Sequence, residues 1–234
     1  IEMNILFKSI FILLLFQSKI FAACNFQSIN FIDELSQPEN IKDISIKVKN
    51  YRAWSINIYK VFRNKDKLIN KERKKNFKSI VTIRYPWGEC NYKANVRLTG
   101  DGLDHINLTK NGFQQSVKVN LKEGNILNRV SFKLLRPETR VGDMEIIGTE
   151  ILRSFGFLSP LTFNVKSKIN DVEKWMLFQE NPSKEMLELN SRREGPLYEG
   201  DESILFNKKW NPKLKKFSAA RMENYKWAEK NNTN

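Results

Sequence analysis

The sequence has few of the residues from which most catalytic and metal sites are built. It contains one histidine, two cysteines, 10 glycines and 7 prolines in 234 residues. A single histidine excludes histidine-rich metal sites and mechanisms that need two imidazoles, and two cysteines exclude a four-cysteine zinc site and a disulfide-dense scaffold. The low glycine and proline content excludes collagen-like and low-complexity chains. We therefore assign no metal ligands from the sequence.

Acidic residues are scarce relative to basic ones. The chain has 26 Asp and Glu against 40 Lys and Arg, which gives a formal net charge of +14. This excess attracts anionic partners such as acidic polysaccharides, lipid headgroups or teichoic-type polymers, although an AT-rich genome would also enrich lysine. Basic residues are spread along the whole chain and are not interleaved with aromatics on one element, which disfavours nucleic acid as a partner. The 41% hydrophobic content predicts a folded core.

Residues 1–23 have the pattern of a secretory signal peptide. Lys8 precedes a continuous apolar run over residues 10–16, and the small residues Ala22 and Ala23 follow. The run is too short to span a bilayer, so we expect no transmembrane span after cleavage. The expected location is periplasmic, cell-surface or secreted. An uncleaved membrane anchor and a buried apolar strand are the alternatives.

Export would place the two cysteines in an oxidising compartment. There Cys24 and Cys90 can pair and close a loop of about 65 residues, worth ~3–4.5 kcal/mol in the chain-entropy description. The alternative is that Cys24 carries a lipid, because the preceding Phe-Ala-Ala resembles a lipoprotein signal, and that Cys90 is a small buried hydrophobe.

Hydrophobic periodicity divides the remaining chain into three parts. Residues 24–76 predict an N-terminal extension with a helix, a short strand at 44–48 and a second helix from Tyr51. Residues 77–198 predict consecutive strands with short turns, a helix over 144–155, a hairpin and a short helix. Residues 199–234 predict the start of a second lobe with a helix at 217–230, truncated at Asn234.

The order of these elements predicts an α+β fold, an antiparallel sheet with one polar face and a packed helix. In the helix over 144–155, Met144, Ile147, Ile151 and Phe155 recur at helical spacing. This apolar stripe predicts the face that packs on the sheet.

Three collinear segments resemble the spore coat protein H (CotH) kinase-like family. They are Val-Arg-Leu-Thr-Gly-Asp at 96–101, Ser-Val-Lys-Val-Asn-Leu at 116–121 and Glu-Ile-Leu-Arg-Ser-Phe-Gly at 150–156, with a weaker match at 177–180. The resemblance implies that residues 77–198 form the small lobe and hinge of an atypical protein kinase. The family's catalytic aspartate segments lie later in the chain and have no match before Asn234. The sequence therefore assigns no catalytic residue and leaves enzymatic activity open.

The resemblance implies ATP and Mg²⁺ as cofactors and transfer of phosphate to a secreted or envelope protein. Lys118, on the polar face of its strand, would hold the nucleotide phosphates, and Glu150 would orient its ammonium group. The alternatives are an exposed strand lysine and a solvated helix glutamate. Gly100 and Gly102 would let the backbone approach phosphate, or they form a plain hairpin turn. Glu180 would lie in the hinge beside the adenine.

Other polar residues near these segments have more than one interpretation. Arg192 and Arg193 can clamp phosphate or an acidic substrate, or belong to a solvated turn. Asp101 and Asp104 are expected as loop caps rather than metal ligands, and His105 as a surface or hydrogen-bonded residue. The alternative function is a non-catalytic exported α+β module that binds anionic envelope polymers.

Overall fold

The computed structural model describes residues 24–26, 33–65, 67–200 and 220–222. The predicted signal peptide at 1–23 lies outside these residues. Within the described parts of the chain, no helix is both long and apolar enough to cross a membrane.

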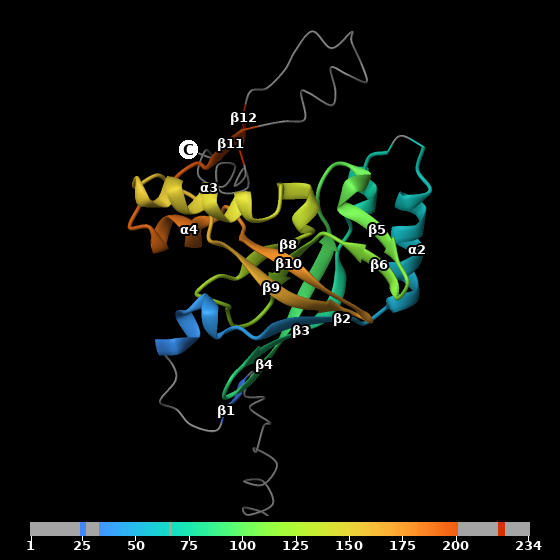
Figure 1. Ribbon diagram of the computed structural model, residues 1–234, viewed down its shortest axis with the longest axis horizontal. Helices are drawn as coiled ribbons and strands as arrows, with labels where there is room; N and C mark the ends of the chain where they lie inside the picture. The colour runs from blue at the N-terminus through green and yellow to red at the C-terminus, as the bar shows by residue number, and fades with distance from the viewer. Residues whose placement is uncertain (1–23, 27–32, 66, 201–219, 223–234) are drawn as a thin grey trace, which may run out of the picture.

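The centre of the protein is a closed, mixed β-barrel of seven strands, in an α+β domain (Figure 1). Around the barrel the order is β4–β3–β2–β9–β10–β8–β7, and β7 returns to pair with β4. All neighbours are antiparallel except β2 and β9, which are parallel. The strands are β2 (Asp43–Val48), β3 (Phe77–Tyr85), β4 (Gly88–Leu98), β7 (Val117–Leu121), β8 (Ser131–Leu135), β9 (Thr162–Ile169) and β10 (Val172–Glu180).

The barrel confirms the α+β class and corrects the predicted antiparallel sheet. Alternating side chains indicate which face of a strand is buried, but they do not identify its partner. Residues 24–76, predicted as an extension, contribute β2, which lies between β3 and β9 and closes the barrel. The first predicted helix in this range is replaced by β1 (Cys24–Phe26) and two 3-10 turns, Asp33–Ser36 and Pro38–Asn40.

The core fills the barrel with apolar side chains from alternate strand positions. Phe178 of β10 stacks between two other rings, with centroid distances of 4.8 Å to Phe132 and 4.6 Å to Phe163. Phe132 and Phe178 are fully buried. Burial on this scale is the main stabilising contribution to the fold.

Helix α2 (Tyr51–Phe62) packs part of its predicted apolar stripe on the barrel, since Trp54, Ile58 and Val61 are buried but Phe62 is exposed. Asn50 caps it by accepting a hydrogen bond from the Ala53 amide at 3.0 Å. Trp54 is buried and makes an edge-on contact with Phe77 at 5.1 Å between centroids. Tyr51 lies on the exposed side of the helix.

Helix α3 (Asp143–Ser154) forms where predicted but presents the opposite face to the barrel. Met144, Ile147, Ile151 and Phe155, the stripe expected to pack on the sheet, are all exposed. The buried member of the helix is Thr149. The prediction of the packed face is therefore wrong, because polar groups of the helix bond to the barrel instead.

The C-terminal part of the described chain contains α4 (Lys184–Leu189) and a small two-stranded sheet. This sheet pairs β11 (Tyr198–Gly200) with β12 (Ala220–Met222). The helix predicted at 217–230 is wrong at 220–222, which are extended. The rest of that range and residues 201–219 lie outside the described residues.

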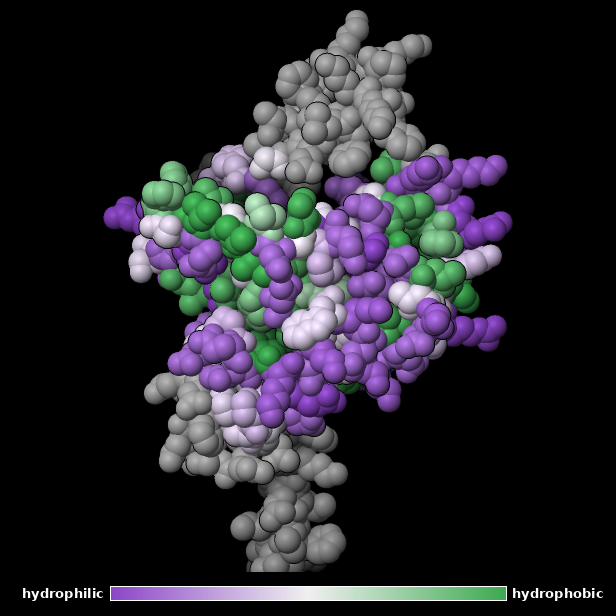
Figure 2. Space-filling view, in the orientation of Figure 1, coloured by the Kyte–Doolittle hydropathy of each residue, from purple (hydrophilic) through white to green (hydrophobic). Residues whose placement is uncertain are grey.

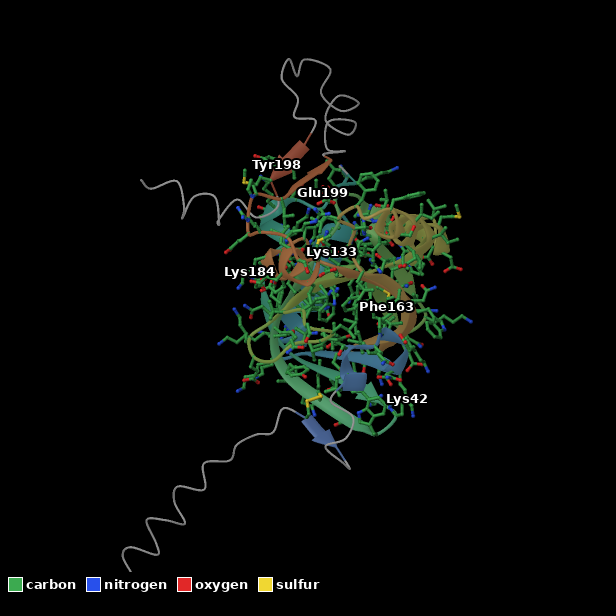
Figure 3. The ribbon with its side chains drawn as sticks, turned by 90° about the vertical axis from the view of Figure 1, so that its left-hand side faces the viewer. Lys42, Lys133, Phe163, Lys184, Tyr198 and Glu199 are labelled. Atoms are coloured by element: carbon green, nitrogen blue, oxygen red, sulfur yellow. A yellow bond between two sulfur atoms is a disulfide. The ribbon has the colours of Figure 1, made fainter. Side chains whose placement is uncertain are left out.

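Cys24 and Cys90 form a disulfide, the first of the two alternatives left open by the sequence. Strand β1 pairs with the start of β4, and its register sets the two cysteines opposite each other. Figure 3 shows the disulfide at the end of the barrel near Lys42. A disulfide-bonded domain is consistent with an oxidising extracellular compartment.

Candidate functional site

A cleft of about 530 Å³ with a largely polar lining lies at one end of the barrel. Its wall combines the ends of β4, β7 and β8 with the loop after β4 and the 3-10 turns Lys71–Arg73 and Pro137–Arg140. Six cationic side chains face two carboxylates, a surplus of four positive charges, and these residues are Lys71, Lys74, Arg97, Lys118, Lys133, Arg140, Asp101 and Asp104. The arrangement suits an anionic ligand.

Three of these cations form a row across adjacent strands. The register sets Arg97 of β4 opposite Lys118 of β7, and Lys118 opposite Lys133 of β8. Adjacent strands lie about 4.8 Å apart, so the register concentrates positive charge on this part of the sheet. All three side chains are half-buried. Figure 3 shows Lys133 in the half of the molecule away from the disulfide.

The loop after β4 reaches the cleft because Gly100 lies against His105. Gly100 has φ +90°, and a Cβ at this position would collide with the His105 ring. Gly102 has an ordinary negative φ, and a Cβ there would meet only the movable carboxylate of Asp104. The structure thus requires glycine at 100 for packing and places both glycines in the cleft wall.

His105 is buried in the wall of the cleft and belongs to a polar network there. Its Nδ1 lies 2.9 Å from Ser116 Oγ, which accepts a hydrogen bond from the Arg136 amide at 2.9 Å. Burial lowers the pKa of His105 to about 4, against the opposing effect of Asp104. The imidazole is therefore neutral at pH 7, and the sequence expectation of a hydrogen-bonded histidine is confirmed.

We expect His105 to make the fold sensitive to acid. The unfolded chain binds the proton with a pKa near 6.5 and the folded chain only near 4, so the unfolded state holds more protons between these values. The free energy of unfolding should fall by up to roughly 3 kcal/mol as the pH is lowered from 6.5 to 4. Urea titrations at several pH values measure this slope. His105→Gln should flatten it; an unchanged slope would contradict the assignment.

One of the two carboxylates of the cleft, that of Asp101, has a structural role. Asp101 pairs with Lys74 at 2.6 Å, and its carbonyl accepts a hydrogen bond from the Ile69 amide at 2.8 Å. Among the described residues, no three His, Cys, Asp or Glu side chains gather to hold a metal ion. Asp101 is already paired with Lys74, so the described residues provide no ligand set for a Mg²⁺ ion held by the protein alone.

The structure does not bring Glu150 into the cleft. It lies on the exposed surface of α3, where its carboxylate pairs with Arg153 at 2.9 Å. Arg192 and Arg193 are exposed and also do not line the cleft; Arg192 donates to the Gly156 carbonyl at 3.0 Å. Of the residues predicted to bind the nucleotide, only Lys118, Gly100 and Gly102 therefore line the cleft.

Glu180, expected beside an adenine, is a buried partner of Arg129. The Arg129 Nε atom lies 2.7 Å from Glu180 Oε1, and Glu180 Oε2 accepts from the Leu161 amide at 3.0 Å. The side chains are 14% and 1% exposed, so this is an ion pair inside the protein. Its neighbour Gln179 donates to Glu145 of α3 at 2.6 Å.

Sequence reasoning missed most of the cations that surround Lys118. Arg97 and Lys133 alternate with buried residues on their strands, which places them on the polar face. That signal, combined with the strand register, would have found both. Lys71, Lys74 and Arg140 come from turns, and no spacing in the sequence connects them to the strands.

Comparison with known proteins adds no relative. No family model matches the chain, and no curated protein matches it.

Proposed function

We propose that the cleft binds the phosphates of a nucleotide such as ATP, and that the domain is the small lobe of an exported CotH-like atypical kinase that phosphorylates secreted or envelope proteins. The row of Arg97, Lys118 and Lys133 is the observation that carries the proposal. These side chains place positive charge side by side on one wall of the cleft, and such charge attracts the phosphates of a triphosphate.

The described residues can hold and orient the phosphates. Lys118 lies at the centre of the row, between Arg97 and Lys133, and would contact the ligand from the floor of the cleft. The loop at Gly100 and Gly102 forms the adjoining wall. Phosphoryl transfer depends mainly on such positioning and on electrostatic stabilisation. The described residues supply binding; the proposed transfer also needs a base, which we do not assign.

We expect Lys118→Ala to weaken ATP binding by about 10- to 100-fold, because a hydrogen bond to a charged group contributes roughly 1.5–3 kcal/mol. Isothermal titration calorimetry with ATP in EDTA measures this effect without a metal. Lys78→Ala is the matched control, since Lys78 is an exposed strand lysine outside the cleft. Equal affinities for wild type and Lys118→Ala, or no binding by a folded wild-type protein, would contradict the proposal.

The charge of the cleft also favours a second candidate, a non-catalytic module for anionic envelope polymers. The six cationic side chains of the cleft provide more positive charge than the single lysine that holds the phosphates in a kinase small lobe. Competition between ATP and poly(glycerol phosphate) distinguishes the two. A polymer that displaces ATP at a tenfold lower phosphate concentration would favour the binding module.

A further inference from the structure

Helix α3 is amphipathic in the reverse sense to a normal surface helix. Its inward side carries polar residues beside the half-buried Ile146: Glu145 accepts from Gln179 at 2.6 Å, Thr149 is buried, and Arg153 donates to the Pro160 carbonyl at 3.0 Å. Glu145, Thr149 and Arg153 lie at i, i+4 and i+8 and so share one face. A surface helix ordinarily buries its apolar stripe and exposes its polar one.

The outward side of α3 and its ends form an exposed apolar face. Figure 2 shows it as the hydrophobic area over this helix. Its members, with their exposed fractions, are Val141 (78%), Met144 (61%), Ile147 (48%), Ile151 (50%), Leu152 (47%), Phe155 (75%) and Phe157 (63%). We call these residues the α3 face. One partner of a standard protein interface contributes about 800 Å², and seven large exposed side chains on one helix make up a substantial part of such a surface. Nothing in the described part of the chain covers these residues, and large apolar patches are uncommon on monomeric proteins.

Gly148 occupies the middle of this face. A glycine inside a helix costs about 1 kcal/mol relative to alanine. Among the described residues nothing requires it, because a Cβ at this position would meet no atom within 4 Å. Glycine here leaves room for a second backbone to approach the helix closely.

Four of the seven residues of the α3 face form two pairs placed symmetrically about Gly148. Met144 and Leu152 lie four residues before and after it, and Val141 and Phe155 lie seven residues before and after it. If two antiparallel copies of the helix are related by a twofold axis at Gly148, the residue a given number of positions before Gly148 in one copy lies opposite the residue the same number of positions after it in the other. These two pairs would therefore meet across the axis, as in a twofold interface.

We propose that α3 is the interface of a symmetric homodimer, in which two copies of the helix cross antiparallel at Gly148. Met144 of one copy packs against Leu152 of the other, and Val141 against Phe155. No residue of α3 lines the basic cleft, so each copy keeps its cleft open to a ligand. The dimer is independent of the proposed function.

Sedimentation equilibrium of the full chain tests this proposal. We expect a monomer–dimer equilibrium in the wild type, strengthened by salt because salt screens the repulsion between two molecules of +14. Ile151→Glu should raise the dimer dissociation constant by about 30-fold or more, as for a residue central to an interface. Leu108→Glu is the control, since Leu108 is 56% exposed on β5 (Ile106–Thr109), outside the α3 face.

The variant Gly148→Leu distinguishes loss of the dimer from loss of the folded structure. Leucine favours helix and has open space at this position, so the melting temperature should stay the same or rise while the dimer is lost. A wild-type protein that stays monomeric at 100 µM would overturn the proposal, and would instead leave the α3 face for another partner. Association that is unchanged in Ile151→Glu and Gly148→Leu, or equally lost in Leu108→Glu, would also overturn it.

Discussion

Replacement of Arg129 by methionine should lower the free energy of unfolding by about 3–5 kcal/mol, the range for breaking a buried ion pair by removing one partner. Glu180 is 1% exposed, and its carboxylate would lose the Arg129 guanidinium while remaining inside the protein. The desolvation of an unpaired charge, more than the lost attraction, causes the effect. Guanidinium chloride unfolding followed by circular dichroism measures it.

A comparison with an exposed pair isolates the role of burial. Lys166 and Glu173 lie 2.8 Å apart, nearly the same distance as Arg129 and Glu180, but both side chains are about half exposed. Lys166→Met should therefore leave stability unchanged within error. The double variant Arg129→Met/Glu180→Gln should recover part of the loss, because it removes the stranded charge. Equal effects of Lys166→Met and Arg129→Met would refute this account.

The second large effect concerns the disulfide. Cys24→Ala opens a covalent loop with a sequence separation of 66 residues, and we expect it to reduce the free energy of unfolding by about 4 kcal/mol. The loss arises mainly in the unfolded chain, which regains conformational freedom. Urea unfolding of oxidised wild type and of the variant gives the difference.

A reducing agent provides the internal control for the disulfide. Dithiothreitol should bring the wild type down to the stability of Cys24→Ala and leave the variant unaffected. A variant within about 1 kcal/mol of the oxidised wild type would show that the loop closure contributes little, contrary to the expectation for a loop of this length.

The sequence predicted local elements well because their signals are local. The alternation over 92–98 and around Lys118 corresponds to β4 and β7, and the periodicity from Tyr51 corresponds to α2. Barrel closure was missed because β2 and β9 are distant in the chain and nothing in either segment identifies the other. The orientation of α3 was missed for another reason. The spacing of apolar residues identifies the apolar face of a helix, but not whether that face points toward the barrel or away from it.

The candidate site was predicted only in part. Resemblance to a family indicated Lys118, Gly100 and Gly102, which the cleft brings together. Arg97 and Lys133 become part of the site only through strand register, which the sequence does not contain for a closed barrel. Glu180 was expected to face a ligand, but its partner Arg129 comes from a different segment and holds it inside.

The parallel pairing of β2 with β9 also determines when this domain can fold. During translation Asp43 is synthesised long before Lys166, its partner in the register. The edge of β2 that pairs with β9 therefore stays unpaired until most of the described chain has been synthesised. Topologies that depend on such distant contacts have high contact order and fold slowly. We therefore expect folding to be post-translational, with chaperones shielding the nascent β2 edge until β9 arrives.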